Sequence, residues 1–299
     1  MTVDSPSLLS LAELEELRHQ LLVIRDHRRR MGTTTDFGVF QSAEYGLGME
    51  AVDTRPYQHG DDTRHIDWRA SARSGKPISK VFHKDLGRKL ILVIDRRPTM
   101  FFGTRNELKA ATAARTAAIL AYTALIEHTH VTAIVINAEY EIFPSIRNID
   151  QLIPLLTALS LPCAAVGNEK QASLIDIFEH SLLQHTGGSS LYIISDFYDL
   201  DYNQEWLWAW IGQKLEVTAL YITDHAEQVL QPVGQIRVRP PANRQTYTID
   251  TDVRDIRQRY ADDARKNNDQ RTQFFSTHNI KSHTLHTDDD LISKLQFIL

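Results

Sequence analysis

The sequence predicts an α/β protein whose main domain is a doubly wound, mainly parallel, Rossmann-like β-sheet, preceded by a helical and irregular extension. Two observations carry this prediction. From Lys89 onward, apolar strand segments alternate with helical segments, as in folds built from βαβ units. The first of these strands, "KLILVID", is a continuous apolar run, which is expected when helices cover both faces of a sheet.

The composition is that of a globular protein of a reducing compartment. The 299 residues are 42% hydrophobic, which suffices for a substantial core. The net charge of −5 gives no general attraction to nucleic acid, so we expect no such partner. The single cysteine, Cys163, excludes an internal disulfide and a cysteine-based zinc site. No apolar run approaches the roughly 20 residues that span a bilayer, and the acidic N-terminus is unlike a signal peptide, so we expect a cytoplasmic protein without a membrane span.

Residues 1–87 are predicted to form an N-terminal extension that begins with one helix. In "SLAELEELRHQLLVIRDHRRRM", leucines recur at helical spacing, and Ser10 followed by Glu13 resembles a capping box. The arginine run that closes this helix suits the negative end of its dipole. A polar, glycine-containing stretch follows, and then a segment dense in charged and aromatic residues.

Residues 88–299 are predicted to form the α/β domain. After the first strand, the chain alternates between helical and strand patterns. In order, these are the helix "RNELKAATAARTAAILAYTALIEH", the strands "VTAIVIN" and "EYEIFPS", the helices "NIDQLIPLLTALS" and "ASLIDIFEHSLLQH", the strand "SSLYIISDF", the helix "NQEWLWAWIGQKL" and the strand "EVTALYITD". In "EWLWAWIG", Trp206 and Trp210 share one helical face and Trp208 lies roughly opposite, so an exposed Trp208 would be a partner anchor.

The tail completes the same domain. A β-hairpin insertion is predicted near residues 230–250, around two consecutive prolines. It is followed by the charged helix "DVRDIRQRYADDARKNNDQRTQFFSTH", the strand "IKSHTLH" and a last helix, "DDDLISKLQFIL". Because a strand and a helix at the end continue the α/β alternation, we expect no separate C-terminal domain.

Three aspartates stand at the ends of predicted strands. These are Asp95, Asp196 and Asp224. In open α/β sheets, sites form outside the carboxyl ends of the strands, so these carboxylates mark the candidate site. The first of them is followed at once by two arginines and a proline, an unusual sequence for a simple metal-binding loop.

The segment before the first strand carries a specific resemblance. "RPYQHGDDTRHIDWRASARSGKPISKVFHKD", directly followed by "LILVIDRRPTMFFGT", resembles the bacterial family called domain of unknown function 58. The residues that carry the resemblance are Arg55, Tyr57, Gly60, Asp61, Asp62, Arg64, Ile66, Asp67, Trp68, Ala72 and Arg73.

The resemblance implies a von Willebrand factor A-like domain with a partner-binding role. Members of the family are thought to act as adaptors or chaperone-like proteins beside MoxR-type AAA+ ATPases and other von Willebrand A proteins. Many of them carry N-terminal membrane helices, and this sequence is similar to the shorter, soluble branch.

The same resemblance raises the question of a metal site. In metal-binding von Willebrand A domains, the first strand ends in Asp-x-Ser-x-Ser, and a threonine and a later aspartate complete a Mg²⁺ shell. Here the positions are Asp95, Arg97 and Thr99, with Asn168 nearest the threonine position and Asp196 as the later aspartate. Because a guanidinium repels a divalent ion at short range, we predict that Arg97 takes the place of the metal and pairs with Asp95 or Asp196. We therefore expect no cofactor and no functional Mg²⁺ at this site; alternatively, Arg97 points to solvent and the site is empty.

The segment "HGDDTRHIDW" allows three interpretations. Adjacent aspartates can hold catalytic metals, as in the Gly-Asp-Asp turn of some polymerases, but nothing else in this sequence resembles a polymerase. The segment can instead be a structural turn, in which Gly60 supplies backbone freedom, an aspartate caps a short helix, and Ile66 and Trp68 pack inward on either side of Asp67. On this hypothesis it clamps the N-terminal region onto the sheet. Alternatively, it forms an exposed partner surface, where arginine and aromatic residues are common.

Enzyme motifs are sparse. Ser71 and Ser195 lack the glycine elbow of hydrolases, and no phosphate-binding loop occurs. We therefore expect a non-enzymatic adaptor that acts with a MoxR-type AAA+ ATPase. The rival hypothesis is a metal-dependent hydrolase that uses Asp95 and Asp196, which would need a pocket holding a base and a metal at these strand ends.

Overall fold

A six-stranded sheet forms the centre of the computed structural model, which describes residues 9–30, 51–56, 68–82, 89–161, 172–179, 189–238 and 245–298. The strand order is β10-β7-β6-β3-β4-β5, and every neighbouring pair is parallel except β4 and β5. The strands are β3 (Lys89–Asp95), β4 (His130–Ile136), β5 (Tyr140–Ile146), β6 (Ser190–Ser195), β7 (Glu216–Thr223) and β10 (Lys281–His286). The α/β class and the mainly parallel sheet predicted from the sequence are confirmed.

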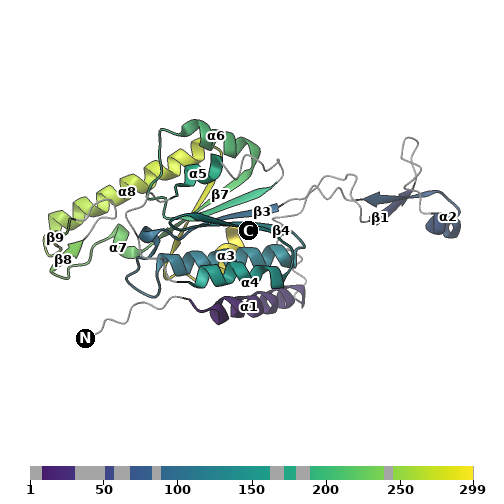
Figure 1. Cartoon of the computed structure of the whole chain (residues 1–299), viewed down its shortest axis with the longest axis horizontal. Helices are drawn as coiled ribbons and strands as arrows, with labels where there is room; N and C mark the ends of the chain where they lie inside the picture. The colour runs from purple at the N-terminus through teal and green to yellow at the C-terminus, as the bar shows by residue number, and fades with distance from the viewer. Residues whose placement is uncertain are drawn as a thin grey trace. The chain divides into compact units, whose positions relative to one another are not determined.

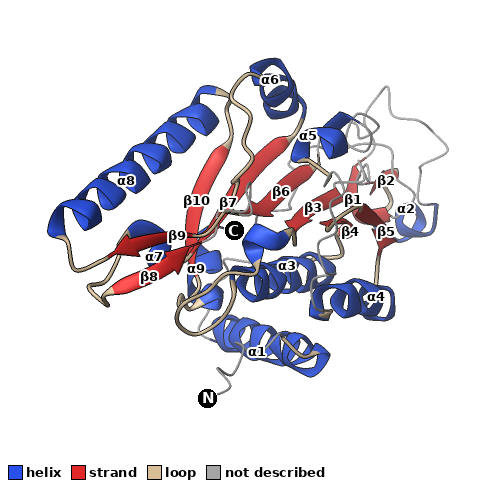
Figure 2. Ribbon diagram, turned by 60° about the vertical axis from the view of Figure 1, so that its left-hand side comes forward, coloured by secondary structure: helices blue, strands red, loops and turns tan. Residues whose placement is uncertain are grey.

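Helices cover both faces of this sheet (Figures 1 and 2). One face carries α3 (Lys109–Ile126), α4 (Ile149–Ser160) and α9 (Leu291–Ile298). The other carries α5 (Leu174–Ile177), α6 (Glu205–Lys214) and α8 (Arg254–Thr277). This double cover explains why β3, β4 and β6 are apolar along almost their whole length and buried at every position except the first residue of β3 and of β4. The short helix α7 (His225–Gln228) follows β7, and an antiparallel hairpin, β8 (Gln235–Val238) with β9 (Tyr247–Asp250), occupies the segment where the sequence predicts one.

The first helix, α1 (Leu11–Arg30), belongs to the same compact unit as the sheet. The chain divides into one unit of Met1–Gly38 with Lys89–Leu299 and a second of Val39–Arg88. Leu14, Leu17 and Leu21 are buried, and α1 packs on α3. The predicted capping box is present, since Glu13 accepts a bond from the Ser10 backbone N–H at 2.7 Å. The sequence-based boundary at residue 87 therefore differs from the structure, because the leucine stripe of α1 has its partner in the alanine-rich α3.

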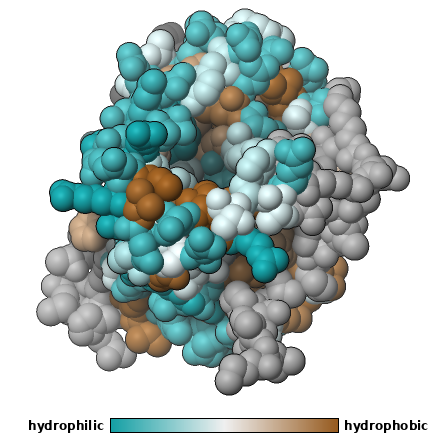
Figure 3. All heavy atoms as spheres, turned by 90° about the vertical axis from the view of Figure 1, so that its left-hand side faces the viewer, coloured by the Kyte–Doolittle hydropathy of each residue, from teal (hydrophilic) through white to brown (hydrophobic). Residues whose placement is uncertain are grey.

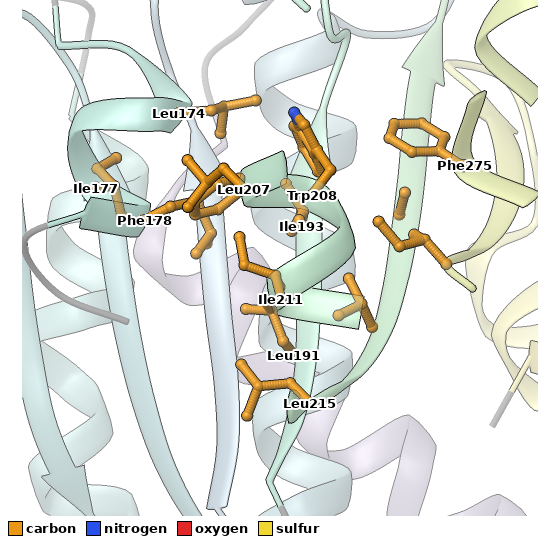
Figure 4. Packing of buried hydrophobic residues seen from close by; sticks show 14 of the residues in the cluster. Leu174, Ile177, Phe178, Leu191, Ile193, Leu207, Trp208, Ile211, Leu215 and Phe275 are labelled. Carbon is orange, nitrogen blue, oxygen red and sulfur yellow. The ribbon is translucent and has the colours of Figure 1, made fainter. Parts of the chain in front are cut away.

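Aromatic residues fill the core between the sheet and the helices α5, α6 and α8 (Figure 4). Trp208 is 1% exposed, and its ring lies edge-on to Phe178 with 5.0 Å between centroids and tilted against Phe275 at 5.6 Å. Trp206, in contrast, is 61% exposed. Trp208 therefore does not meet the condition for a partner anchor, because α6 turns Leu207, Trp208 and Ile211 inward together.

Glycine permits the close approach of α6 to the end of α8. A Cβ atom added at Gly212 would lie 2.1 Å from the carbonyl oxygen of His278. Because real Cβ atoms do not approach an oxygen so closely, any side chain here would push the two helices apart. Gly212 thus fixes how tightly α8 packs over the aromatic core.

The second unit contains an antiparallel pair, β1 (Ala51–Pro56) with β2 (Ile78–Phe82), and the helix α2 (Trp68–Ser74). The Ser71 hydroxyl accepts a bond from the Ile78 backbone N–H at 2.8 Å, which ties α2 to β2. Trp68 is 71% exposed, so the expectation that it packs inward is wrong.

Most of the family motif lies outside the described residues, including the whole Gly-Asp-Asp turn. Arg55 belongs to β1, and Arg73 is an exposed residue in the last turn of α2. The residues outside the described part of the chain are Tyr57, Gly60, Asp61, Asp62, Arg64, Ile66 and Asp67.

Candidate functional site

The candidate site lies at the carboxyl ends of β3, β6 and β7. After β3 the chain proceeds to β4 on one side and later returns to β6 on the other, so a topological switch point lies between β3 and β6. Asp95 ends β3, Asp196 follows β6 and Asp224 follows β7. All three are buried, at 0%, 7% and 0% exposure. Buried carboxylates are rare unless they are paired, so their partners decide what this site can do.

Arg97 pairs with Asp95, one of the two partners predicted for it. Its guanidinium donates two bonds to the carboxylate, Nε to Oδ1 at 3.0 Å and Nη2 to Oδ2 at 2.7 Å. The backbone N–H of Arg97 and the hydroxyl of Ser195 donate to the same carboxylate, at 2.9 and 2.6 Å. Asp95 therefore has a full set of donors and a bidentate cation in contact. The alternative that Arg97 points to solvent is wrong, since Arg97 is 6% exposed.

Asp199 is the second carboxylate that holds Arg97. It accepts from Nη2 at 2.7 Å and also from Nη1. Burial alone would lower the pKa of the Arg97 guanidinium, but its hydrogen bonds to Asp95 and Asp199 outweigh this effect and raise the pKa. The guanidinium is therefore a permanent charge, clamped between a fully buried carboxylate and one that reaches the surface.

Arg96 points away from this site. Its guanidinium donates to the backbone carbonyls of Ala158 and Leu161 at the end of α4, and it lies 5.6 Å from the ring of Phe101. Successive side chains of an extended segment face opposite ways, so one arginine can tie the strand end to a helix while the next enters the site. A cation at the end of α4 also suits the negative pole of that helix.

Asp196 pairs with Lys109 and not with Arg97. The Lys109 ammonium donates to Asp196 at 2.8 Å and to Glu227 at 2.6 Å, and the lysine is 1% exposed. Burial tends to lower the pKa of Lys109, but the charges of Asp196 and Glu227 outweigh it and raise the pKa. The alternative that Asp196 is the partner of Arg97 is thus wrong. Lys109, in the first turn of α3, occupies the position next to Asp196.

Asp224 is stabilised by hydrogen bonds without a cation in direct contact. Thr104 donates through its backbone N–H at 3.0 Å and through its hydroxyl, Ala226 through its N–H at 2.9 Å, and Thr287 through its hydroxyl at 2.9 Å. Burial opposes ionisation, but these bonds outweigh it and lower the pKa of Asp224. This carboxylate joins the loop after β3 to the ends of β7 and β10.

The described residues do not fit a Mg²⁺ ion. The oxygens of Asp95 are taken by Arg97 and Ser195, and Asp196 is held by Lys109. Thr99 lies in the short 3-10 helix η3 (Pro98–Met100), and Asn168 lies outside the described residues. Over the described ranges, no group of three or more His, Cys, Asp or Glu side chains is arranged to hold a metal. A hard cation would have to displace two tethered ones, at the cost of strong repulsion.

Sequence reasoning missed Lys109, Asp199 and Glu227. A weak signal exists for each. Lys109 is a lone cation in the first turn of an otherwise alanine-rich helix, directly after the strand-end loop. Asp199 follows Asp196 by three residues within "SDFYD", and Glu227 forms a capping box with Asp224. None of these patterns reveals which cation meets which carboxylate.

Two solved structures are similar to this chain only at low sequence identity. These structures, the conserved hypothetical protein BatB from Bacteroides thetaiotaomicron and an aerotolerance-related membrane protein from Bacteroides fragilis, are each 12% identical, with a TM-score of 0.43. Each match covers 71% of this chain and 96% of the other. None of the helices in the described part of the chain is both long and apolar enough to cross a membrane.

Sequence comparison gives three short matches to curated proteins and one long match to a family. Uncharacterized proteins of Mycobacterium bovis and Mycobacterium tuberculosis are 36% identical over 73 residues, which is 23% of this chain and 23% of each relative. The matched segment thus spans about a quarter of these curated relatives. The pattern of the family described as "Protein of unknown function DUF58" matches residues 53–270, well over half of the sequence. The chain therefore belongs to the DUF58 family.

Proposed function

We propose that the protein is a non-enzymatic adaptor with a von Willebrand factor A-like domain. In this proposal it works in the cytoplasm with a MoxR-type AAA+ ATPase and with other von Willebrand A proteins, in the assembly or activation of further proteins. The family resemblance drawn from the sequence suggests the partners, and the geometry of the site supports a binding role over catalysis.

The observation that carries the proposal is the internal neutralisation of two strand-end carboxylates, Asp95 and Asp196. Arg97 binds Asp95 at 2.7 and 3.0 Å, and Lys109 binds Asp196 at 2.8 Å. In a metal-dependent domain of this kind, an exchangeable ion would connect such carboxylates to a partner. With tethered cations in that place, partner binding would not depend on Mg²⁺, and neither Asp95 nor Asp196 is left to hold a catalytic metal.

Exposed aromatic residues next to these ion pairs supply a plausible binding surface. Tyr198 is 57% exposed, and its backbone N–H donates to Asp196 at 3.2 Å. Phe102 is 41% exposed, and its ring centroid lies 5.9 Å from the Lys109 ammonium. Figure 3 looks onto the end of the molecule that carries α7, β8 and β9 in Figure 1, and shows hydrophobic patches beside a recess in a mostly hydrophilic surface. Aromatic side chains of this kind are typical anchors of protein interfaces.

Binding of a purified MoxR-type ATPase tests the proposal. The ATPase is first identified by mass spectrometry after capture from native lysate, and its affinity is then measured with the wild-type chain and with the Tyr198→Ala, Phe102→Ala double variant. Phe297→Ala is the matched control, because Phe297 is 91% exposed near the end of α9, a helix that leads away from the carboxyl ends of the strands. We expect the double variant to bind at least about tenfold more weakly and the control to bind normally.

Two results would contradict the adaptor. One is the absence of any binding between the wild-type chain and the purified ATPase. The other is hydrolysis by the isolated chain that requires a divalent metal and disappears in Asp95→Ala, which would favour the metal-dependent hydrolase.

A further inference from the structure

A cleft of about 570 Å³ opens beside the paired carboxylates. One wall is α8, and the other is formed by the segments that follow β6 and β7. This volume lies within the range of about 300–1,000 Å³ that is typical of ligand sites. The ion pairs described above border the cleft only through Asp196 and Glu227, so most of its lining has no role in that site.

The α8 wall combines small residues with polar ones on a single helical face. Ala261, Ala264, Asn268 and Arg271 follow one another at intervals of three and four, so their side chains share one side of the helix. The two alanines leave room in front of the helix. The rest of α8 is strongly charged, which makes this small, partly buried stripe stand out.

Arg271 is a buried guanidinium without a carboxylate partner among the described residues. It is 9% exposed, lies 3.3 Å from the Tyr221 ring centroid and donates to Asn268 at 2.6 Å. No carboxylate oxygen in the described part of the chain lies within ion-pair distance of it. A guanidinium has five N–H donors, and burying its charge without a carboxylate is costly. An anionic ligand in the cleft would supply the missing partner.

The other lining residues favour a peptide over a phosphate compound. Asp196 and Glu227 also face the cleft and share the single positive charge of Lys109, and Arg265, the other cation of the lining, is exposed and pairs with Asp262. The negative charge left over from these two carboxylates disfavours a group with several negative charges, whereas a single carboxylate can lie against Arg271. Asn267, Asn268, Gln270 and Gln228 offer amide groups that match the donors and acceptors of a peptide backbone. Tyr198 and Val229, both more than half exposed, provide apolar contact at the rim.

We propose that this cleft binds a short peptide segment through one acidic side chain, with Arg271 as the anchor and Tyr198 and Val229 contacting an apolar neighbour of that residue. The inference deepens the adaptor function and rests on it, because the segment would belong to a protein partner. Peptide binding and ATPase binding are measured separately, so either can fail while the other holds.

The test uses isotopically labelled full-length protein and capped tripeptides in which glutamate stands between leucine and phenylalanine. A matched peptide carries glutamine in place of glutamate. We expect the glutamate peptide to shift the NMR signals of the Arg271 Nε–H and the amides of α8, and the glutamine peptide to bind at least about tenfold more weakly. Arg271→Gln should abolish the difference between the two peptides. Arg259→Gln, an exposed arginine on the same helix, is the matched control and should keep it.

A second variant keeps the proposal testable if Arg271→Gln does not fold. Ala264→Phe leaves Arg271 in place but fills the space in front of α8, so it should prevent binding of the glutamate peptide. Equal signal shifts with both peptides, no shift at millimolar concentration, or unchanged binding by Ala264→Phe would each overturn the proposal. So would equally tight binding of the glutamine peptide with a free C-terminal carboxylate, since this would assign the cleft to chain ends.

Discussion

Replacing Arg97 by methionine is the sharpest test of the ion pair at the end of β3. Methionine keeps an unbranched apolar stem but removes the guanidinium and with it every side-chain donor. Asp95, which is fully buried, then loses the two guanidinium bonds at 2.7 and 3.0 Å and keeps those from Ser195 and the backbone. Breaking one side of a buried pair costs about 3–5 kcal/mol, and the two surviving bonds place the expected loss near the lower value, about 3 kcal/mol.

Urea unfolding followed by the fluorescence of Trp208, which is buried in the core, measures this loss. With a denaturant slope of about 3 kcal/mol per molar, the midpoint should fall by about 1 M. The control is Arg265→Met. Arg265 is 69% exposed and pairs with Asp262, so the loss of this ion pair should change the free energy of unfolding by about 1 kcal/mol at most. If Arg97→Met changed the midpoint no more than this control does, the claim that Arg97 neutralises Asp95 would be refuted.

Three further predictions concern the fold around the site. Gly212→Ala should lower the free energy of unfolding by about 1–3 kcal/mol, because the new Cβ would lie 2.1 Å from the carbonyl oxygen of His278, just after α8; an unchanged urea midpoint would contradict this packing. Asp224→Asn should destabilise the protein at pH 7. Because the folded-state pKa of Asp224 is lowered, its contribution is present above the unfolded pKa of about 3.9 and is lost as the pH falls through the folded value, so the difference from wild type should shrink below about pH 4 in pH-dependent urea unfolding. Trp208→Ala should lower the free energy of unfolding by about 3–5 kcal/mol, and Trp206→Ala by about 0.5 kcal/mol or less. Thermal unfolding measures both losses, and a larger loss in Trp206→Ala would contradict the orientation of α6.

Much of the fold could be predicted because it depends on local patterns. Continuous apolar runs such as "KLILVID" and "LYIIS" identify buried parallel strands, and the order of strands and helices gives the α/β class. The rotation of α6 could not be predicted, because "EWLWAWIG" has apolar residues on all sides. Trp208 is the buried one because it packs against Phe178, Phe274 and Phe275, which come from other segments of the chain. The placement of α1 on the sheet unit was likewise missed, since a leucine stripe does not specify its partner.

The site could be predicted in position but only partly in its contacts. The rule that sites form at the carboxyl ends of strands located Asp95 and Asp196, and the charge of Arg97 led to its pairing with Asp95. The pair of Lys109 with Asp196 depends on where the first turn of α3 lies relative to β6, across 87 residues of sequence. A charge pattern along the chain contains no information on such a distance. The cleft lined by Arg271 could not be predicted either, because it depends on how α8 packs over the ends of β6 and β7.

The central claim is that tethered cations take the place of a metal at these strand ends. Thermal unfolding of the wild-type chain with and without millimolar Mg²⁺ or Mn²⁺ tests it most directly, with Asp95→Ala as the control. A ligand present at 100 times its dissociation constant would stabilise the fold by about 2.7 kcal/mol, which is easily detected. We predict no saturable stabilisation of the wild type by either ion. A saturable stabilisation that is lost in Asp95→Ala would contradict the account.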